Sequence, residues 1–200
     1  ITGGPGTGKT TSVVLILWGL FQIYGKDLKI LLGAPTGKAA QRVKESLQDN
    51  LDNIEDNLNL DISDIRNFLN NNESCGTIHK LLGYIHQSIY FRYNNENNLG
   101  ADVLIIDESS MISLPLFYKL ISAINISKIK HLIFLGDPNQ LYSVEEGFVF
   151  NSLVNASSAP YYVSALTISK RNQGDVSRLA KAILDNNSAL VMDILNNSKF

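Results

Sequence analysis

The sequence predicts an α/β domain with a mostly parallel sheet and helices on both faces. Short apolar runs, typical of buried strands, are each followed by a helical pattern, and this repeated order implies parallel strands. The 200 residues are 44% hydrophobic, enough for one substantial core and too few for two ordinary domains. The sharpest polar motifs follow the apolar runs, at the sheet edge where such folds bind ligands.

Four apolar segments are expected to form strands. They are Ile1–Thr2 as the remainder of one strand, Lys29–Leu32, Val103–Ile106 and Leu132–Leu135. The repeated order of a strand and then a helix indicates a parallel sheet with helices on both faces. The whole chain, residues 1–200, is therefore interpreted as a single domain.

Two segments depart from the repeating pattern. Residues 49–75 are rich in Asn, Asp and Glu, with Leu and Ile spaced as in amphipathic helices, which predicts a small helical insertion. Residues 84–100 combine aromatic residues with the polar tip Asn94–Asn98, which indicates a small hairpin insertion or an exposed loop. The aromatic residues could stack on unpaired bases, or they could pack in the ordinary way.

Composition excludes several classes of site. The net charge is -2, so any contact with nucleic acid must be a local groove. The single cysteine, Cys75, excludes an intrachain disulfide and a cysteine-cluster metal site. The longest apolar run, Val13–Phe21, is too short to span a bilayer, so we expect a cytoplasmic protein without membrane contact.

A phosphate-binding loop is expected at the start of the chain, where residues 3–10 match G-x-x-x-x-G-K-T. The glycines let backbone N–H groups point at phosphate oxygens. Lys9 is expected to contact the β and γ phosphates of ATP, and the Thr10 hydroxyl to ligate Mg²⁺. The residues expected to bind the nucleotide are Gly4, Pro5, Gly6, Thr7, Gly8, Lys9, Thr10 and Thr11.

Two carboxylates end the expected strand Val103–Ile106. Asp107 is predicted to hold Mg²⁺ or its water shell opposite Thr10, and Glu108 to orient or deprotonate the attacking water. Solvated acids at a strand end are the alternative.

Gln140 follows the next strand, within the sequence Gly-Asp-Pro-Asn-Gln. Its amide both donates and accepts hydrogen bonds, so Gln140 is a candidate sensor of the γ phosphate. The alternative interpretation of this motif is a turn.

The order of the motifs resembles superfamily 1 DNA helicases and, within them, the RecD family, the alpha subunit of exodeoxyribonuclease V. The stretches that carry the likeness are residues 1–11, 34–40 with Arg42, 77–83, 107–111 with Leu114 and Pro115, and 135–141 continuing to Gly147. The likeness implies a RecA-like P-loop NTPase domain, the first motor domain of a larger helicase that moves 5′ to 3′ on single-stranded DNA. It also implies a nuclease-helicase subunit and a recombination-signal subunit as partners.

The resemblance assigns further residues. Pro35, Thr36 and Lys38, together with Thr77 and His79, correspond to motifs that contact DNA in the family. Thr77 is also suited to cap a helix, and His79 to pack against its neighbours.

Arg171 corresponds to an arginine that reaches the γ phosphate, although Ser-Lys-Arg stands here where relatives more often have Ser-Tyr-Arg. A surface arginine is the alternative for Arg171. A stand-alone RecD-like helicase and a DNA-independent P-loop ATPase remain alternative functions.

Overall fold

A computed structural model describes residues 1–71, 73–156, 162–169 and 174–197. The strands are β1 (Thr2–Gly3), β2 (Ile30–Ala34), β3 (Cys75–Thr77), β4 (Val103–Ile106), β5 (His131–Phe134) and β6 (Ala165–Leu166). The helices are α1 (Lys9–Tyr24), α2 (Gly37–Leu58), α3 (Ser63–Asn70), α4 (Ile78–Leu81), the 3-10 turn η1 (Ser109–Met111), α5 (Leu114–Ser122), α6 (Val149–Asn155), α7 (Asp175–Leu184) and α8 (Ser188–Asn197). The α/β class is confirmed. β4 has the expected bounds, whereas β2 and β5 are displaced by one or two residues.

Among the described residues, all the strand pairs are parallel. Four strands pair in the order β3-β2-β4-β5, and β1 pairs with β6. A parallel bridge joins Thr2 to Gly136, just beyond β5, and the Gly3 N–H donates to the Gly136 carbonyl over 3.1 Å. This bridge continues the sheet from β5 to β1 and β6. The carboxyl ends of the strands therefore lie along one edge, where ligands of such sheets bind.

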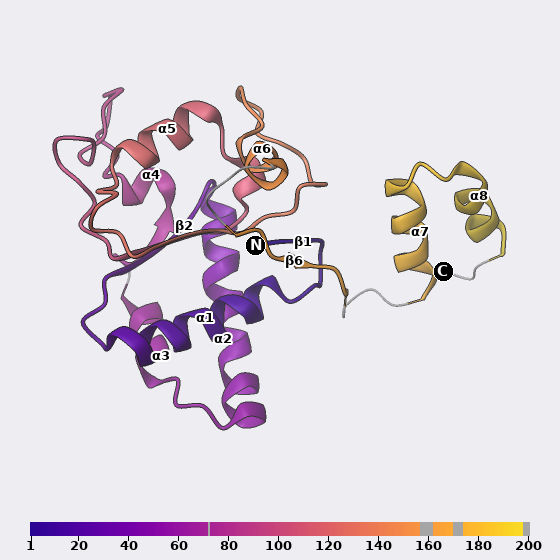
Figure 1. The fold of residues 1–200 in the computed structure, drawn as a ribbon, viewed down its shortest axis with the longest axis horizontal. Helices are drawn as coiled ribbons and strands as arrows, with labels where there is room; N and C mark the ends of the chain where they lie inside the picture. The colour runs from indigo at the N-terminus through magenta and orange to yellow at the C-terminus, as the bar shows by residue number, and fades with distance from the viewer. Residues whose placement is uncertain (72, 157–161, 170–173, 198–200) are drawn as a thin grey trace.

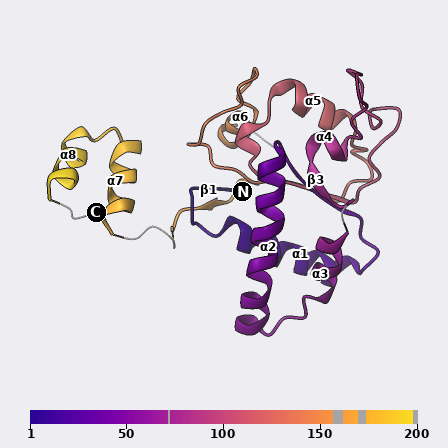
Figure 2. The same cartoon turned by 180° about the vertical axis from the view of Figure 1, so that it is seen from behind.

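Helices cover both faces of the sheet. In Figure 1, α1 and α3 lie on one side of the sheet and α4 and α5 on the other, and Figure 2 shows α2 with α1 and α3 from behind. β4 supplies both cores, because successive side chains of a strand point to opposite faces. Val103 and Ile105 join the cluster of α1, α2 and α3, whereas Leu104 and Ile106 join the cluster of α4 and α5. This two-sided burial explains why β4 is apolar throughout.

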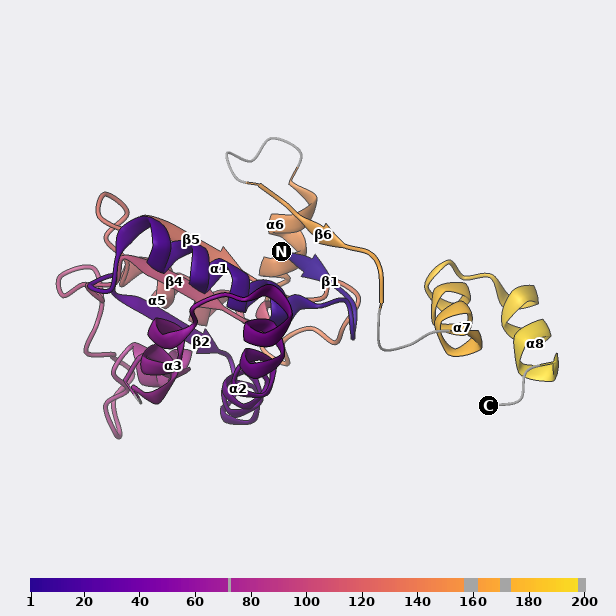
Figure 3. The same ribbon diagram turned by 90° about the horizontal axis from the view of Figure 1, so that it is seen from below.

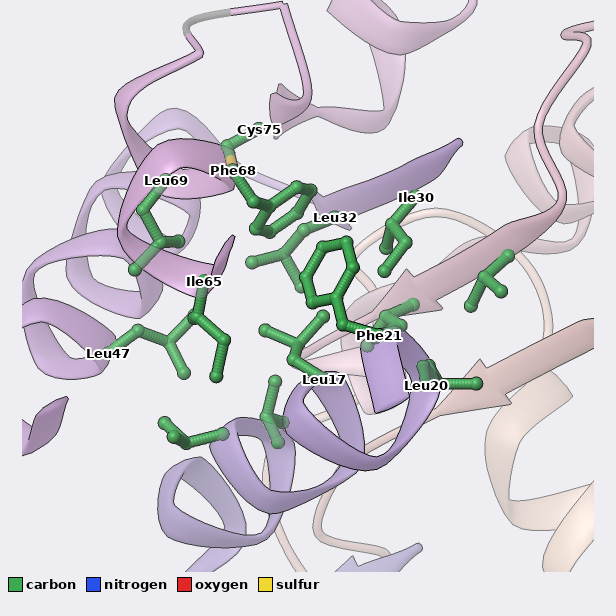
Figure 4. Close-up of a cluster of buried hydrophobic side chains, with 14 of the residues drawn as sticks. Leu17, Leu20, Phe21, Ile30, Leu32, Leu47, Ile65, Phe68, Leu69 and Cys75 are labelled. Carbon is green, nitrogen blue, oxygen red and sulfur yellow. The ribbon is translucent and has the colours of Figure 1, made fainter. Parts of the chain in front are cut away.

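The larger core lies between α1, α3 and β2. Figure 4 shows Leu17 and Phe21 of α1 near Phe68 of α3 and Leu32 of β2. The rings of Phe21 and Phe68 meet edge to face with their centroids 6.4 Å apart. Leu17 is fully buried, so this cluster fixes the helix that follows the phosphate-binding loop.

The two segments that interrupt the sequence pattern differ in form. Residues 49–58 continue α2, so the predicted start of the helical insertion falls within a helix, and α3 packs into the larger core. Residues 84–100 contain one antiparallel bridge, between Tyr84 and Phe91, and no strand. The Asn94 side chain accepts from the N–H groups of Glu96 and Asn97, which closes the predicted polar turn. The division into one domain with two insertions stays a prediction.

α7 and α8 pack against each other, and Figure 3 shows this pair apart from the sheet. Within the described ranges, no helix is both long and apolar enough to cross a membrane.

Candidate active site

The phosphate-binding loop opens with a tight turn between β1 and α1. The Gly4 carbonyl accepts hydrogen bonds from the Thr7 N–H at 3.4 Å and from the Thr7 hydroxyl at 2.8 Å. Pro5 and Gly6 are the central residues of this turn, and Gly6 has a φ of 74°. This pattern is typical of a type II turn, which favours proline and then glycine at its central positions.

Lys9 lies within the loop that this turn begins. Gly8, with a φ of 90°, directly precedes α1, and Lys9 is the first residue of the helix. The Lys9 ammonium donates to the carbonyl oxygens of Gly3 and Gly4. Thr10 and the neighbouring Thr11 lie half-buried in the first helical turn. The loop therefore combines a cation with the positive end of a helix dipole.

Asp107 is buried beside this cation. Its N–H donates to the Gly33 carbonyl over 2.9 Å, continuing the β2–β4 ladder, and its Oδ1 accepts from the Glu108 N–H over 2.8 Å. Burial raises the pKa of the Asp107 carboxyl, while the Glu108 N–H and the Lys9 ammonium lower it. The strand thus places Asp107 close to the lysine of the loop.

Glu108 adopts a left-handed backbone conformation, with a φ of 51°, which is uncommon outside glycine. Its Oε2 is buried and has no hydrogen-bond partner in the described parts of the chain. Burial raises the pKa of the Glu108 carboxyl, and the charges of Asp107 and Asp137 raise it further. The cations of Lys9 and Arg42 oppose this rise. The result is a carboxylate more basic than an ordinary glutamate and able to accept a further proton or hydrogen bond.

Asp137 is a member of this cluster that the sequence interpretation missed. Its side chain is 4% exposed, its Oδ1 accepts from the Asn139 N–H, and a Cβ added at Gly4 would lie 3.8 Å from its Oδ2. A turn at residues 136–140 explains the hydrogen bond between Asp137 and Asn139. It does not explain why Asp137 lies beside the phosphate-binding loop. The signal was its place shortly after the apolar run Leu132–Leu135, which was expected to form a strand. Gln140 lies half-buried at the end of the same turn, where its N–H donates to the Asp137 carbonyl.

The residues that correspond to DNA-contacting motifs lie along the adjacent part of the same edge. Ala34 is in register with Thr77, so the segments that follow β2 and β3 begin side by side. Pro35 is half-buried, whereas Thr36 and Lys38 are exposed. The Thr36 hydroxyl oxygen caps α2 by accepting from the Ala39 N–H over 3.2 Å.

Thr77 and His79 also have local partners. The Thr77 hydroxyl oxygen accepts from the Lys80 N–H over 3.1 Å, so its predicted role as a helix cap is confirmed. The His79 ring meets Phe91 at 5.6 Å between centroids and remains exposed. A capping threonine keeps its hydroxyl proton for another acceptor, so capping and phosphate contact are compatible.

Arg171 lies outside the described residues. Ser169, the last described residue before it, donates through its hydroxyl to the Pro5 carbonyl over 3.1 Å. Sequence reasoning missed this contact because it joins residues 164 positions apart.

The fold and the loop define a nucleotide-binding domain of the P-loop class. The chain belongs to the AAA domain family, whose model matches residues 1–146. It is 45% identical over 161 residues to the RecBCD enzyme subunit RecD of Haemophilus influenzae, covering 80% of this chain and 24% of that protein. It is also 32% identical over 157 residues to the ATP-dependent RecD2 DNA helicase of Deinococcus radiodurans, covering 78% of this chain and 18% of that protein. The resemblance to RecD inferred from the motifs is confirmed.

A crystal structure of Bacteroides Pif1 bound to ssDNA has the same fold. The matched region covers 98% of this chain and 44% of the Pif1 chain, with a TM-score of 0.55 and 22% sequence identity. Because the chain spans less than a third of each RecD-type relative reported above, the activity, substrates and partners of the whole protein remain to be proposed.

Proposed function

We propose that this chain is the ATP-binding motor domain of a 5′–3′ DNA helicase that acts in exodeoxyribonuclease V, in double-strand break repair and recombination. The proposal rests on the arrangement of residues along the carboxyl edge of the sheet. Along this edge, the cluster of Lys9, Asp107 and Glu108 stands next to the exposed segments after β2 and β3. A domain of this kind can respond to ATP and to DNA at neighbouring positions.

The residues present fit ATP with Mg²⁺. Lys9 and the N-terminus of α1 supply positive charge for phosphates, and the glycine-rich turn supplies backbone N–H groups. Thr10 and the buried Asp107 are the oxygen ligands that would hold Mg²⁺, which would neutralise phosphate charge. Glu108 Oε2 is buried without a hydrogen-bond donor among the described residues, and a water molecule bonded to it would satisfy that oxygen.

Hydrolysis then depends on groups of this chain. The attacking water would form a bond to the γ phosphorus while the bond from that phosphorus to the bridging oxygen breaks and ADP leaves. Glu108 Oε2 would accept the proton of this water, and its raised pKa favours that transfer. The Gln140 amide is proposed to orient the γ phosphate or the water. Arg171 is proposed to stabilise charge on the γ phosphate, a contribution of about 10³- to 10⁵-fold in turnover.

Single-stranded DNA is the proposed second substrate. Pro35, Thr36 and Lys38 would contact it on one segment, and Thr77 and His79 on the neighbouring one. The exposed Lys38 ammonium and the threonine hydroxyls are suited to phosphate oxygens.

The proposed partners are the nuclease-helicase and recombination-signal subunits of exodeoxyribonuclease V, and we expect that complex in the cytoplasm. The likeness to RecD2 favours a second candidate, a stand-alone RecD-like helicase. Co-purification of the full-length protein with the other two subunits supports the first function, whereas a monomer that unwinds DNA supports the second.

The test is ATP hydrolysis by the full-length protein with and without single-stranded DNA. We expect DNA to stimulate hydrolysis, and Lys9→Ala or Glu108→Gln to abolish the stimulated rate. Lys128→Ala and Glu73→Gln, at exposed positions away from the carboxyl edge, are the matched controls. Hydrolysis that is indifferent to DNA would assign the protein to the DNA-independent P-loop ATPases instead.

A further inference from the structure

Residues 162–169, which we call the strap, lie beside the phosphate-binding loop. Figure 3 shows β6 alongside β1, and Gly3 is in register with Leu166. A Cβ added at Gly3 would stand 3.1 Å from Leu166 Cβ, closer than ordinary van der Waals contact. The strap therefore packs directly on the residues that lead into the loop.

The strap ends on the turn of the loop. The Ser169 hydroxyl donates to the Pro5 carbonyl over 3.1 Å. Pro5 and Gly6 share the central peptide bond of this turn, and rotation of that peptide is what distinguishes a type II turn from a type I turn. The Pro-Gly sequence favours the type II orientation, and the hydrogen bond from Ser169 adds to that preference by holding the Pro5 carbonyl, because glycine can also adopt the type I conformation.

The peptide between Pro5 and Gly6 is trans, as are all the described peptide bonds. In a trans peptide the C=O and the following N–H point in opposite directions across a rigid plane. A hydrogen bond that holds the Pro5 oxygen toward the strap therefore directs the Gly6 N–H away from the strap.

We propose that Ser169 is a positioning residue for nucleotide binding, because its hydroxyl fixes the Pro5–Gly6 peptide with the Gly6 N–H presented to a phosphate group. This inference rests on the proposed ATP site and adds a residue to it. Ser169 acts through the loop and touches no reacting atom. It therefore governs nucleotide affinity, and the rate of hydrolysis at saturation depends on other groups.

The experiment measures binding of a fluorescent ADP with Mg²⁺ to the full-length protein, together with kcat and KM for ATP. Ser169→Ala removes the donor, and Ser169→Thr keeps a hydroxyl. Ser164→Ala is the matched control, because Ser164 contributes to the strap through its backbone carbonyl, which accepts from the Thr2 N–H over 2.8 Å.

We expect Ser169→Ala to weaken ADP binding about 3- to 10-fold, as for loss of one hydrogen bond, with a similar rise in KM and less than about a twofold change in kcat. Ser169→Thr and Ser164→Ala should bind ADP within about twofold of the wild type. Loss of packing alone would predict the same defect in all three variants.

Two results would overturn the proposal: wild-type ADP affinity in Ser169→Ala, or an equal loss in Ser169→Thr. The Lys9→Ala variant tests the nucleotide site itself, so it separates failure of the Ser169 proposal from failure of the proposed function. If Lys9→Ala abolishes ADP binding while Ser169→Ala leaves it unchanged, the nucleotide site stands and only the role of Ser169 is lost. If the wild type binds no nucleotide, the proposed function fails together with this inference.

Discussion

Replacing Glu108 with glutamine tests the chemistry of the site with little change in shape. Glutamine keeps the size and one carbonyl oxygen of the side chain but has no basic carboxylate. Since Glu108 is the proposed general base, we expect kcat to fall about 10²- to 10⁴-fold, which corresponds to roughly 3 to 5 kcal/mol in the barrier. ADP affinity should be preserved, because the proposed phosphate contacts come from the loop and Lys9 and not from Glu108.

The same variant should change the pH dependence of stability. Burial first, and then the neighbouring carboxylates, hold the pKa of Glu108 above its unfolded value, so its ionised form destabilises the fold. In the wild type, this group favours folding fully below its unfolded pKa, and the benefit is lost as the pH rises through the higher folded pKa. Glu108→Gln removes this dependence, so the variant should be the more stable of the two at pH 8 and should lose that advantage near pH 4.

The assays are ATP turnover with single-stranded DNA and denaturant unfolding at both pH values. Glu73→Gln, an exposed substitution of the same kind, controls for the loss of one negative charge. A kcat within about tenfold of the wild type would refute the role of Glu108 as a base. An unchanged difference in stability between pH 4 and pH 8 would refute the electrostatic account of its pKa.

Three further predictions concern the loop, the core and the DNA edge. Gly8→Ala forces alanine into a φ of 90° and should lower the free energy of unfolding of the 200-residue chain by about 1–2 kcal/mol, measured with denaturant. Gly37→Ala is the control and should cost less than about 0.5 kcal/mol. Equal costs would show that the left-handed backbone at Gly8 does not require glycine. Leu17→Ala should cost about 2–5 kcal/mol in the same measurement, and Leu15→Ala, at a side chain 40% exposed, much less; a small cost at Leu17 would contradict the fold. In the full-length protein, Lys38→Ala should lower the slope of log affinity for single-stranded DNA against log salt by about 0.7, as for one lost phosphate contact, and an unchanged slope would place the DNA elsewhere.

The elements that could be predicted are those that carry their own sequence signal. β4 could be predicted with its full bounds because Val103–Ile106 is apolar throughout, as befits a strand buried on both faces. A helix such as α1 ordinarily follows a phosphate-binding loop. β1 and β6 have two residues each, which is too short for any periodicity to develop. Their pairing depends on the rest of the sheet.

The residues of the site also fall into those with a local sequence signal and those that depend on tertiary packing. Lys9 and Asp107 follow from motif and strand order, since parallel strands bring their carboxyl ends together. The left-handed backbone of Glu108 and the approach of Asp137 depend on tertiary packing, which has no local signature. Ser169 reaches Pro5 across 164 positions, a distance at which a single sequence gives no pairing information.

The pairing of β1 with β6 has a consequence for the order of folding. The loop that begins at Gly3 is flanked by a strand from near the other end of the domain. Closing so long a stretch of chain is entropically costly and slow, so this contact belongs to a late stage of folding. During synthesis, when residues 1–150 have left the ribosome, the phosphate-binding loop still lacks the strap that packs beside it. The ability to hold a nucleotide tightly should therefore appear only once the strap has docked, which would make nucleotide capture a marker of completed folding.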